Sequence, residues 1–381
     1  MILRGGLVLN SDYGYDLRDV YVDDDTGLIS DRASGDAVDC SGKKILPGFS
    51  DTHIHGFRGT DVSDADAEGI IKMALELPSA GVTSFCPTTM TLPYDRIYDV
   101  FSAVSRAKLY LDRCDDPHAR ILGVHLEGPF LTGDGGNIQR PEYMRKPSEG
   151  YELIDKLESD FPGLLKIIDV APELEGSMEF IRHYSSRYII SIAHSRCDYE
   201  TASEAIFNGV SSVTHILNAM TPIDKRSPGI ACAAFDHGCY AEIICDGIHI
   251  EAPVLRMLFK TIDIDHTIVI SDSMRGAGMP DGDYRLGDAM VRCEKGRTWY
   301  GASGSLAGSL TDLFSEYKIL TSSGIPEPQV IRSLTVNPLR RLGMPGGTIT
   351  QGLPADLIVT DGNLPLVTYC MGKGKLCYNC L

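Results

Sequence analysis

The chain has 381 residues, of which 43% are hydrophobic and 23% charged, a composition typical of a globular protein with a sizeable core. Its formal net charge of -17 argues against nucleic acid as a partner, because a phosphate backbone binds basic surfaces. No stretch reaches the apolar length of a membrane span, and the first residues do not resemble a signal peptide. These features predict a cytoplasmic protein without nucleic-acid or membrane partners.

Eleven cysteines are scattered through apolar segments such as TSFCPTT and EIICDG. An odd number without a signal peptide favours free thiols in a reducing compartment over a disulfide framework. Cys377 and Cys380 in the terminal CYNC resemble half of a zinc knuckle, but no second CxxC pair accompanies them. Alternating residues of a last strand are therefore the preferred interpretation.

The elements predicted along the chain fall into three parts. The first 45 residues (MILRGGLVLN, DVYVDDDTGLIS) and the last 37 (GLPADLIVTDG) predict short strands with turns. From residue 50 to about 343, apolar strands alternate with amphipathic helices such as AEGIIKMALELPSAG and YDRIYDVFSAVSRAKLYL. The predicted strands are FSDTHIH, TSFCPTT, ILGVHLEG, KIIDVAPE, IISIAHS, SVTHILN, AEIICDG and TIVISDS. Eight strand-helix units favour an α/β fold with a closed parallel (β/α)8 TIM-type barrel, and an open doubly wound sheet is the alternative.

Imidazole and carboxylate side chains stand at the ends of most of these strands. His53 and His55 end the first strand, and both can face one point because residues two apart on a strand point to the same side. Later strands end in Glu127, His194, His215, Asp246 and Asp272. A lone histidine at a strand end is more often structural. In a parallel barrel, however, all these ends gather on one face, where so many polar groups would be expensive to desolvate without a cation.

This set of side chains indicates a chemistry. Imidazoles and carboxylates without thiolates favour a divalent zinc, iron or manganese ion over a structural cysteine site. Such an ion lowers the pKa of a water molecule and polarises a carbonyl group. Asp272 is the candidate for taking the proton from that water and returning it to the leaving group. The combination predicts metal-assisted hydrolysis of an amide or a related bond.

Several motifs resemble the amidohydrolase superfamily: LPGFSDTHIHG at the first strand, the strand ends with His194, His215 and Asp272, and the tail NPLRRLGM…GGTITQGLPADLIV. Within it, HLEGPF, AHS, THILNAM, RSPG, DGIH, SDS and LAGS are similar to the N-acetylglucosamine-6-phosphate deacetylase family. The resemblance covers nearly the whole chain. It implies a metal-dependent hydrolase barrel over residues 50–343 and a small β-sandwich formed by residues 1–49 with 344–381.

The resemblance also implies a reaction and its metal ligands. The reaction is hydrolysis of the N-acetyl group of N-acetylglucosamine 6-phosphate, which gives glucosamine 6-phosphate and acetate in amino-sugar catabolism. The main ion would bind Glu127, His194 and His215, and a second ion would bind His53 and His55, with Glu127 as a bridge. One or two divalent ions are thus expected, zinc or iron before manganese.

The resemblance also implies which residues transfer the proton and which bind the substrate. Asp272 would act first as general base and then as general acid. The implied substrate contacts are Asn218 and Ala219 with the sugar phosphate, Arg226 with its phosphate, His249 with the sugar and Leu306 with the acetyl group. A bidentate guanidinium suits phosphate, and Arg226 would come from the neighbouring subunit of a homodimer. His125, two residues before Glu127, is predicted to orient a ligand or to pack.

Gln139 stands where many relatives carry a histidine that helps to polarise the acetyl carbonyl. A glutamine can donate a hydrogen bond to a developing oxyanion, but it cannot carry a positive charge. The loop before it, LTGDGGN, is acidic and rich in glycine where relatives often have lysines. N-acetylgalactosamine 6-phosphate therefore stays open as a substrate. A hydrolase of N-acyl amino acids or cyclic amides stays open too, as does a metal-binding scaffold without catalysis.

Overall fold

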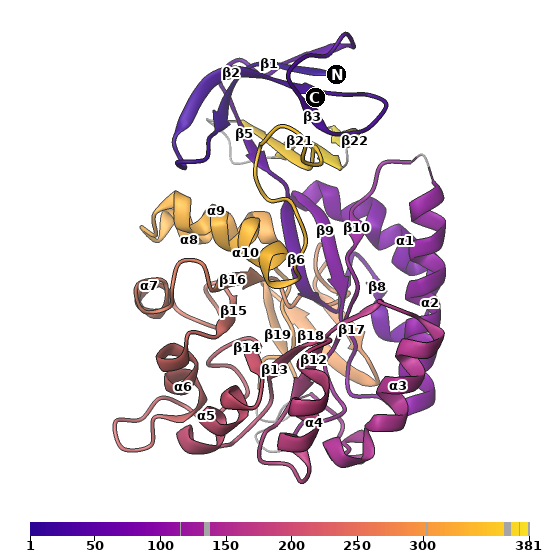
Figure 1. Ribbon diagram of the computed structural model, residues 1–381, viewed down its shortest axis with the longest axis vertical. Coiled ribbons are helices and arrows are strands. Elements are labelled where there is room, and N and C mark those ends of the chain that lie inside the picture. The colour runs from indigo at the N-terminus through magenta and orange to yellow at the C-terminus, as the bar shows by residue number, and fades with distance from the viewer. Residues whose placement is uncertain (115, 133–137, 302–303, 362–366, 373, 380–381) are drawn as a thin grey trace.

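The computed structural model describes residues 1–114, 116–132, 138–301, 304–361, 367–372 and 374–379. Strands from both ends of the chain form one sheet at the top of the molecule (Figure 1). Its order is β22 (Lys375–Asn379), β21 (Val367–Gly372), β20 (Leu357–Asp361), β5 (Lys43–Pro47), β1 (Ile2–Leu9), β2 (Tyr15–Val22) and β3 (Ile29–Ser30), with β4 (Ala37–Asp39) beside β1. β20 runs antiparallel to β5, so the C-terminal strands complete a sheet that the N-terminal strands begin.

This terminal sheet has its own hydrophobic cluster. Leu3, Val20, Ile45, Leu357 and Val359 are among its members, and none is more than 1% exposed. Because apolar residues from both termini share this cluster, the two β-rich ends of the sequence pack as one unit. The cluster is separate from the larger one that surrounds the parallel strands.

Parallel strands form the middle of the molecule. They are β6 (Phe49–Ile54), β9 (Val82–Pro87), β10 (Arg120–Ile121), β11 (Val124–Leu126), β12 (Leu165–Val170), β13 (Ile189–Ile192), β14 (Val210–Val213), β15 (Tyr240–Ile244) and β16 (Thr267–Ile270). One sheet has the order β10-β9-β6, and the other runs from β11 to β16 in sequence order. Every residue of β6, β9 and β16 is buried, as expected for parallel strands covered on both faces. Each of the eight predicted strand segments overlaps an observed strand, and the fold is a mixed α/β fold.

Helices follow these strands and cover them from outside (Figure 1). They are α1 (Ala67–Glu76), α2 (Tyr94–Arg113), α3 (Tyr151–Asp160), α4 (Ser177–Tyr184), α5 (Tyr199–Phe207), α6 (Gly229–His237), α7 (Ala252–Thr261), α8 (Leu313–Ser322), α9 (Glu327–Leu334) and α10 (Val336–Arg341). Short 3-10 turns occur at Val62–Asp64, Leu77–Ala80, Pro141–Tyr143 and Pro147–Glu149. Throughout the described ranges, no helix combines the length and the apolar character that crossing a membrane would demand.

Side chains in the sequence explain where several helices begin and which face they bury. Asp66, Asp198 and Asp312 precede α1, α5 and α8, and each carboxylate accepts a hydrogen bond from a backbone N–H of the first turn. Such a cap typically contributes about 1 kcal/mol. In α2, Ile97 and Val100 lead a series of buried apolar residues at intervals of one to four positions, which is the face that packs on the core.

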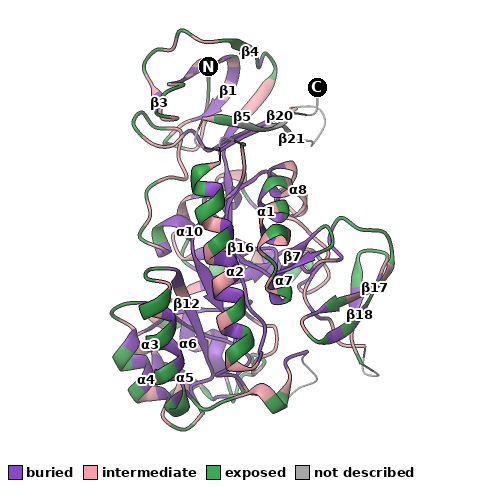
Figure 2. Ribbon diagram, turned by 90° about the vertical axis from the view of Figure 1, so that its right-hand side faces the viewer, coloured by how far each residue is buried: buried purple, intermediate pink, exposed green. Residues whose placement is uncertain are grey.

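A small antiparallel sheet interrupts the strand-helix alternation after β16 and was not predicted. It consists of β17 (Gly282–Leu286), β18 (Ala289–Glu294) and β19 (Arg297–Trp299), and it projects from the body of the molecule (Figure 2). Buried and exposed residues alternate along β18, which is the pattern of a strand with one face on the core. A shorter pair, β7 (Gly56–Phe57) and β8 (Thr60–Asp61), follows β6.

Candidate metal centre

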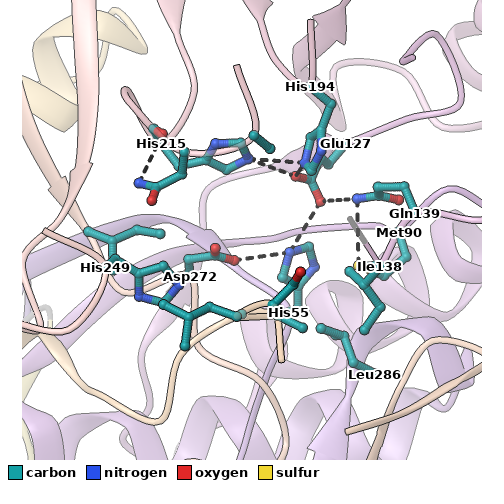
Figure 3. A pocket seen from close by; sticks show the side chains of 17 residues that line it. His55, Met90, Glu127, Ile138, Gln139, His194, His215, His249, Asp272 and Leu286 are labelled. Carbon is teal, nitrogen blue, oxygen red and sulfur yellow. Dashed lines mark hydrogen bonds and ion pairs between the residues drawn. The ribbon is translucent and has the colours of Figure 1, made fainter. Parts of the chain in front are cut away.

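Six predicted polar side chains meet at the carboxyl ends of the parallel strands. Figure 3 shows all of them except His53. They are His53 in β6, His55 just after it, Glu127 after β11, His194 after β13, His215 after β14 and Asp272 after β16. None is more than 8% exposed. Side chains separated by as many as 219 positions in the sequence are thus gathered because parallel strands end at one edge.

Glu127, His194 and His215 form a first group whose atoms converge as metal ligands do. His194 Nε2 lies 2.8 Å from Glu127 Oε1, and His215 Nε2 lies 3.2 Å from the same oxygen. The two ring nitrogens are 3.2 Å apart. One carboxylate oxygen and two imidazole nitrogens therefore face one point.

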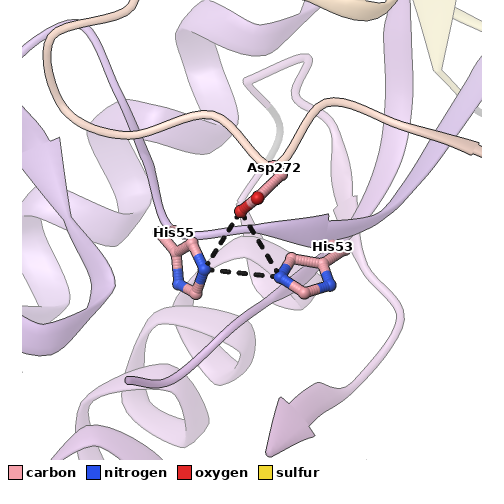
Figure 4. Close-up of side chains that lie close together, drawn as sticks. All are labelled: His53, His55 and Asp272. Carbon is pink, nitrogen blue, oxygen red and sulfur yellow. Dashed lines mark hydrogen bonds and ion pairs between the residues drawn. The ribbon is translucent and has the colours of Figure 1, made fainter. Parts of the chain in front are cut away.

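His53, His55 and Asp272 form the second group (Figure 4). The two Nε2 nitrogens are 3.3 Å apart, and Asp272 Oδ1 lies 3.5 Å from His53 Nε2 and 3.2 Å from His55 Nε2. His55 Nδ1 lies 3.2 Å from the carbonyl oxygen of Thr88. Because a carbonyl oxygen can only accept a hydrogen bond, Nδ1 carries the hydrogen. In the neutral ring, the lone pair of His55 Nε2 then points into the group.

Glu127 spans both groups. Its Oε1 faces the two histidines of the first group, and its Oε2 lies 3.3 Å from His55 Nε2 of the second. A carboxylate placed in this way can supply one oxygen to each of two neighbouring cations. Glu127 therefore lies between the two groups, with one oxygen toward each.

The charges within the site reinforce one another. Burial would raise the pKa of Glu127, but hydrogen bonds from His194 and the charge of that ring outweigh it and hold the pKa well below its usual value. Burial likewise favours a raised pKa for Asp272, but the hydrogen bond from His55 and the neighbouring imidazoles lower it. Burial lowers the pKa of His215, but Glu127, together with the negative charges of Asp272 and Asp169, outweighs burial and raises the pKa to about 9. The two carboxylates are therefore anionic and need positive charge beside them.

Three of these residues have unusual backbones. His194, His215 and Asp272 have φ angles of 43°, 30° and 47°, in the left-handed region that non-glycine residues rarely adopt. Such a conformation costs about 1–3 kcal/mol and persists only where the surroundings impose it. Asp272 N donates to the carbonyl of His53 at 3.0 Å, which ties the strained residue to the backbone of another member of its own group. The strain is concentrated at the strand ends that carry the candidate ligands.

The site forms the floor of a cavity of about 330 Å³. Five of the six predicted substrate contacts line this cavity: Gln139, Asn218, Ala219, His249 and Leu306. Arg226 does not line it and is exposed on the loop before α6. His53 lies behind the cavity wall, fully buried.

Gln139 is held in a fixed orientation. Its Oε1 accepts a hydrogen bond from the backbone N–H of Thr91 at 2.8 Å, and its Nε2 donates to Glu127 Oε2 at 2.9 Å (Figure 3). The same nitrogen lies 4.0 Å from Met90 Sδ. The amide therefore fixes the bridging carboxylate, a contact that the sequence did not indicate. The glycine-rich stretch at 133–137 lies outside the described residues.

Two further side chains support the site from behind. Asp246 Oδ2 accepts a hydrogen bond from His249 Nδ1 at 2.8 Å and so sets the direction of that ring. His125 does not line the cavity; its Nδ1 lies 3.0 Å from the carbonyl of Thr52, and its Nε2 lies 3.1 Å from Asp169 Oδ1. His125 is thus a buried support and not a ligand of either group.

Sequence reasoning missed the apolar wall of the cavity and the layer beneath the histidines. The missed lining residues are Met90, Ile138, Ile244 and Leu286. Single apolar residues carry no signal of their own, and Leu286 belongs to the unpredicted small sheet. In the layer below, Glu242 lies in the middle of a predicted strand, between apolar neighbours. An acidic residue at such a position could have indicated a buried, paired carboxylate.

Comparison with known proteins agrees with this architecture. The family model described as "Amidohydrolase family" matches residues 45–377. The chain therefore belongs to the amidohydrolase family. N-acetylglucosamine-6-phosphate deacetylase of Bacillus subtilis (strain 168) is 34% identical over 86% of this chain and 84% of its own. N-acetylgalactosamine-6-phosphate deacetylase of Escherichia coli O157:H7 is 31% identical over 84% of each. A solved mutant of the Mycobacterium smegmatis N-acetyl-D-glucosamine-6-phosphate deacetylase, in complex with N-acetyl-D-glucosamine-6-phosphate, has a TM-score of 0.90 at 26% identity and covers 100% of this chain and 99% of its own.

The residues present fit the divalent cation that this family implies. Both groups offer three ligand atoms within 4.8 Å of one another, all from imidazole or carboxylate. Hard and borderline divalent ions take these ligands, and the anionic carboxylates provide the charge that such an ion neutralises.

Proposed function

We propose that the protein hydrolyses the N-acetyl group of N-acetylglucosamine 6-phosphate with the help of one or two divalent cations, most simply zinc or iron. The reaction yields glucosamine 6-phosphate and acetate. The observation that carries this proposal is the pair of ligand groups joined by Glu127 on the floor of a cavity, with Asp272 facing both. The deacetylases among its relatives supply the substrate class.

Glu127, His194 and His215 would hold the main ion, and His53 and His55 the second. A bound cation at this place acidifies water and polarises the acetyl carbonyl. The residues of the chain then have to move protons and to orient the substrate.

Asp272 is the residue that we assign to proton transfer. Its lowered pKa keeps the carboxylate ionised at neutral pH, so it can accept the proton of the attacking water. It then delivers that proton to the amide nitrogen, and the amino sugar leaves. The positive φ of Asp272 turns its side chain from the end of β16 into the cavity that it lines.

Gln139 would stabilise the oxyanion. One hydrogen of its amide group is donated to Glu127, and the second is directed at the weak acceptor Met90 Sδ, 4.0 Å from the nitrogen. Gln139 and Met90 both line the cavity. We assign this second hydrogen to the acetyl oxygen, where a donor in a buried site stabilises developing negative charge.

The remaining contacts follow from the cavity wall. Leu306 would contact the acetyl methyl group, and Asn218 and Ala219 the sugar phosphate. His249, whose Nδ1 is engaged by Asp246, would present Nε2 to a sugar hydroxyl. These groups bind the parts of the substrate that do not react.

A phosphate group binds best beside a positively charged side chain. Among the described residues that line it, none is lysine or arginine. Arg226 is exposed outside this cavity, so we propose that it reaches the phosphate in a neighbouring subunit. The functional unit is then a homodimer.

We further propose that the parallel strands close into a (β/α)8 barrel over residues 50–343. Residues 120–126 link the two sheets, because β10 pairs with β9 and β11 pairs with β12. On the other side, Asp272 N donates to the carbonyl of His53, which joins the chain after β16 to β6. Residues 1–49 with 344–381 form the proposed β-sandwich domain, supported by its separate hydrophobic cluster.

A reducing compartment is consistent with the thiols. Eight of the cysteines that the structure describes carry free thiols, and six of these eight are buried: Cys40, Cys86, Cys197, Cys239, Cys245 and Cys293. We therefore place the protein in the cytoplasm.

The test is acetate release by the purified protein with divalent cation present. N-acetylglucosamine 6-phosphate is expected to be the preferred substrate over its galactosamine isomer, with N-acetylglucosamine and N-acyl amino acids turned over at least 100-fold less efficiently. A preference for N-acetylgalactosamine 6-phosphate would make that sugar the substrate instead, which is the substrate named for the Escherichia coli relative. Hydrolysis of an N-acyl amino acid or cyclic amide alone would contradict the proposal. Cation binding without any hydrolysis would identify a scaffold instead.

A further inference from the structure

A buried ion pair lies beneath the second ligand group. Glu242, in the middle of β15, is 0% exposed, and its Oε1 accepts a hydrogen bond from Arg341 Nη2 at 2.6 Å. The side chain of Arg341 is itself 1% exposed, although the residue belongs to α10, near the end of the chain. A buried charge pair is expensive to desolvate, so its presence calls for a reason beyond stability.

Arg341 is fixed by several strands at once. Its Nη1 donates to Ser212 Oγ in β14 at 2.9 Å, and its Nη2 also donates to Thr52 Oγ1 in β6 at 2.7 Å. With Glu242 in β15, the guanidinium thus contacts three strands. Its planar fork leaves little freedom to the carboxylate that it holds.

The second oxygen of Glu242 faces a candidate metal ligand. Glu242 Oε2 lies 3.2 Å from His53 Nδ1. A carboxylate accepts hydrogen bonds, so Nδ1 carries the hydrogen. In the neutral ring, Nε2 then keeps its lone pair, and this nitrogen is the one that faces His55 and Asp272. A carboxylate behind a ligating histidine is a known way to orient the ring and raise its affinity for a metal.

The same residues do not form a third cation site. His125 lies close to His53 and Glu242, and the three could geometrically surround an ion. However, His125 Nδ1 faces the carbonyl of Thr52 and Nε2 faces Asp169, so both nitrogens face acceptors. The adjacent guanidinium of Arg341 adds a positive charge that repels a cation.

We propose that Glu242 and Arg341 are positioning residues that fix the tautomer of His53 and thereby set the cation affinity of the group His53, His55 and Asp272. Neither residue lines the cavity, so neither touches the substrate. This inference rests on the metal binding in the proposed function, and it assigns a role to a residue of the last helix, far from the cavity in sequence.

Glu242→Gln tests this arrangement directly. With Arg341 beside it, the amide must turn its oxygen toward the guanidinium and its NH2 group toward His53. That NH2 group donates to Nδ1, which moves the ring hydrogen to Nε2 and removes the lone pair from the ligand group. Glu316→Gln is the matched control, because Glu316 is equally buried but contacts Cys245 instead of His53.

The measurement is calorimetric titration of chelator-stripped protein with Zn²⁺ alone. The wild type is expected to bind two ions, and H53A/H55A identifies which event belongs to the second group. E242Q should weaken the affinity of the second group for Zn²⁺ about 10- to 100-fold and leave the affinity of the first group unchanged. E316Q should match the wild type at both groups. Nitrogen NMR of the metal-free protein should show the His53 hydrogen on Nδ1 in the wild type and on Nε2 in E242Q.

Different failures identify different errors. Affinities of E242Q within twofold of the wild type, or an unchanged tautomer, would overturn the positioning role. A wild type that binds no cation would instead overturn the proposed function. If circular dichroism shows E242Q to be unfolded, Glu242→Asp keeps the charge beside Arg341, withdraws the carboxylate from His53 and should weaken the same event.

Discussion

Glu127 is the residue that makes one site out of two ligand groups. Its two oxygens face different groups, and Gln139 donates to Oε2 while Thr91 holds Gln139 in place. Because the carboxylate is fixed at both oxygens, a shift of any strand that carries these residues would disturb both groups. The position of the Glu127 side chain therefore depends on all the strands whose carboxyl ends carry the candidate ligands.

Asp272 is expected to be essential for turnover but not for binding at the main ligand group. Asp272→Asn keeps the size of the side chain and removes its ability to take a proton. The rate of acetate release should fall roughly 10²- to 10⁴-fold, the usual contribution of general acid-base catalysis. Metal analysis should still find the ion held by Glu127, His194 and His215. Near-normal turnover by this variant would show that another group moves the proton.

The histidines of β6 are expected to contribute only part of the activity. H53A/H55A removes the imidazoles of the second group and leaves Glu127, His194 and His215 intact. The variant should therefore retain one ion per chain and a reduced but measurable rate. His194→Ala, in contrast, breaks the first group and should abolish turnover. Loss of all bound metal in H53A/H55A would contradict this division of ligands.

At the scale of the elements, strand ends were the predictable part. Each of the eight apolar segments overlaps a strand, and the residues at their ends meet because parallel strands share one edge. The small sheet β17–β19 was missed because its residues form a local antiparallel pattern inside a strand-helix alternation. The partners Glu242 and Arg341 were missed because the contact depends on α10 returning to the strands, which no local pattern encodes.

Helix α8 carries a buried acid whose titration should be visible in stability. Burial raises the pKa of Glu316 well above its usual value, and the negative charge of Asp246 adds to this effect. An acid with a higher pKa in the folded state binds more protons folded than unfolded. The free energy of unfolding therefore falls as pH rises above the unfolded value of about 4.3, by at most ~1.4 kcal/mol per pH unit.

Glu316→Gln removes this titration. Its free energy of unfolding, measured by urea denaturation and expressed relative to the wild type, should increase from pH 5 to pH 8. Glu204→Gln, on the exposed face of α5, serves as the control and should show no such trend. A constant difference between E316Q and the wild type over this range would mean that Glu316 does not titrate as its burial implies.

At the scale of the molecule, the chain combines a terminal sheet with a catalytic body. Of the C-terminal strands, β20 pairs with β5, and β6, which carries His53, begins only two residues after β5 ends. Both β-rich ends and the central alternation were predictable from local patterns. Their pairing was not, since Leu357 and Pro47 lie far apart in sequence and local patterns do not specify partners. The family resemblance supplied what the local patterns could not.

The metal dependence of deacetylation is the most direct test. Protein stripped by a chelator, with its metal content verified, should release no acetate from N-acetylglucosamine 6-phosphate. Addition of Zn²⁺ or Fe²⁺ should restore turnover in proportion to the ion bound at Glu127, His194 and His215. Sustained acetate release by verified metal-free protein would contradict a hydrolytic site built around these ligands.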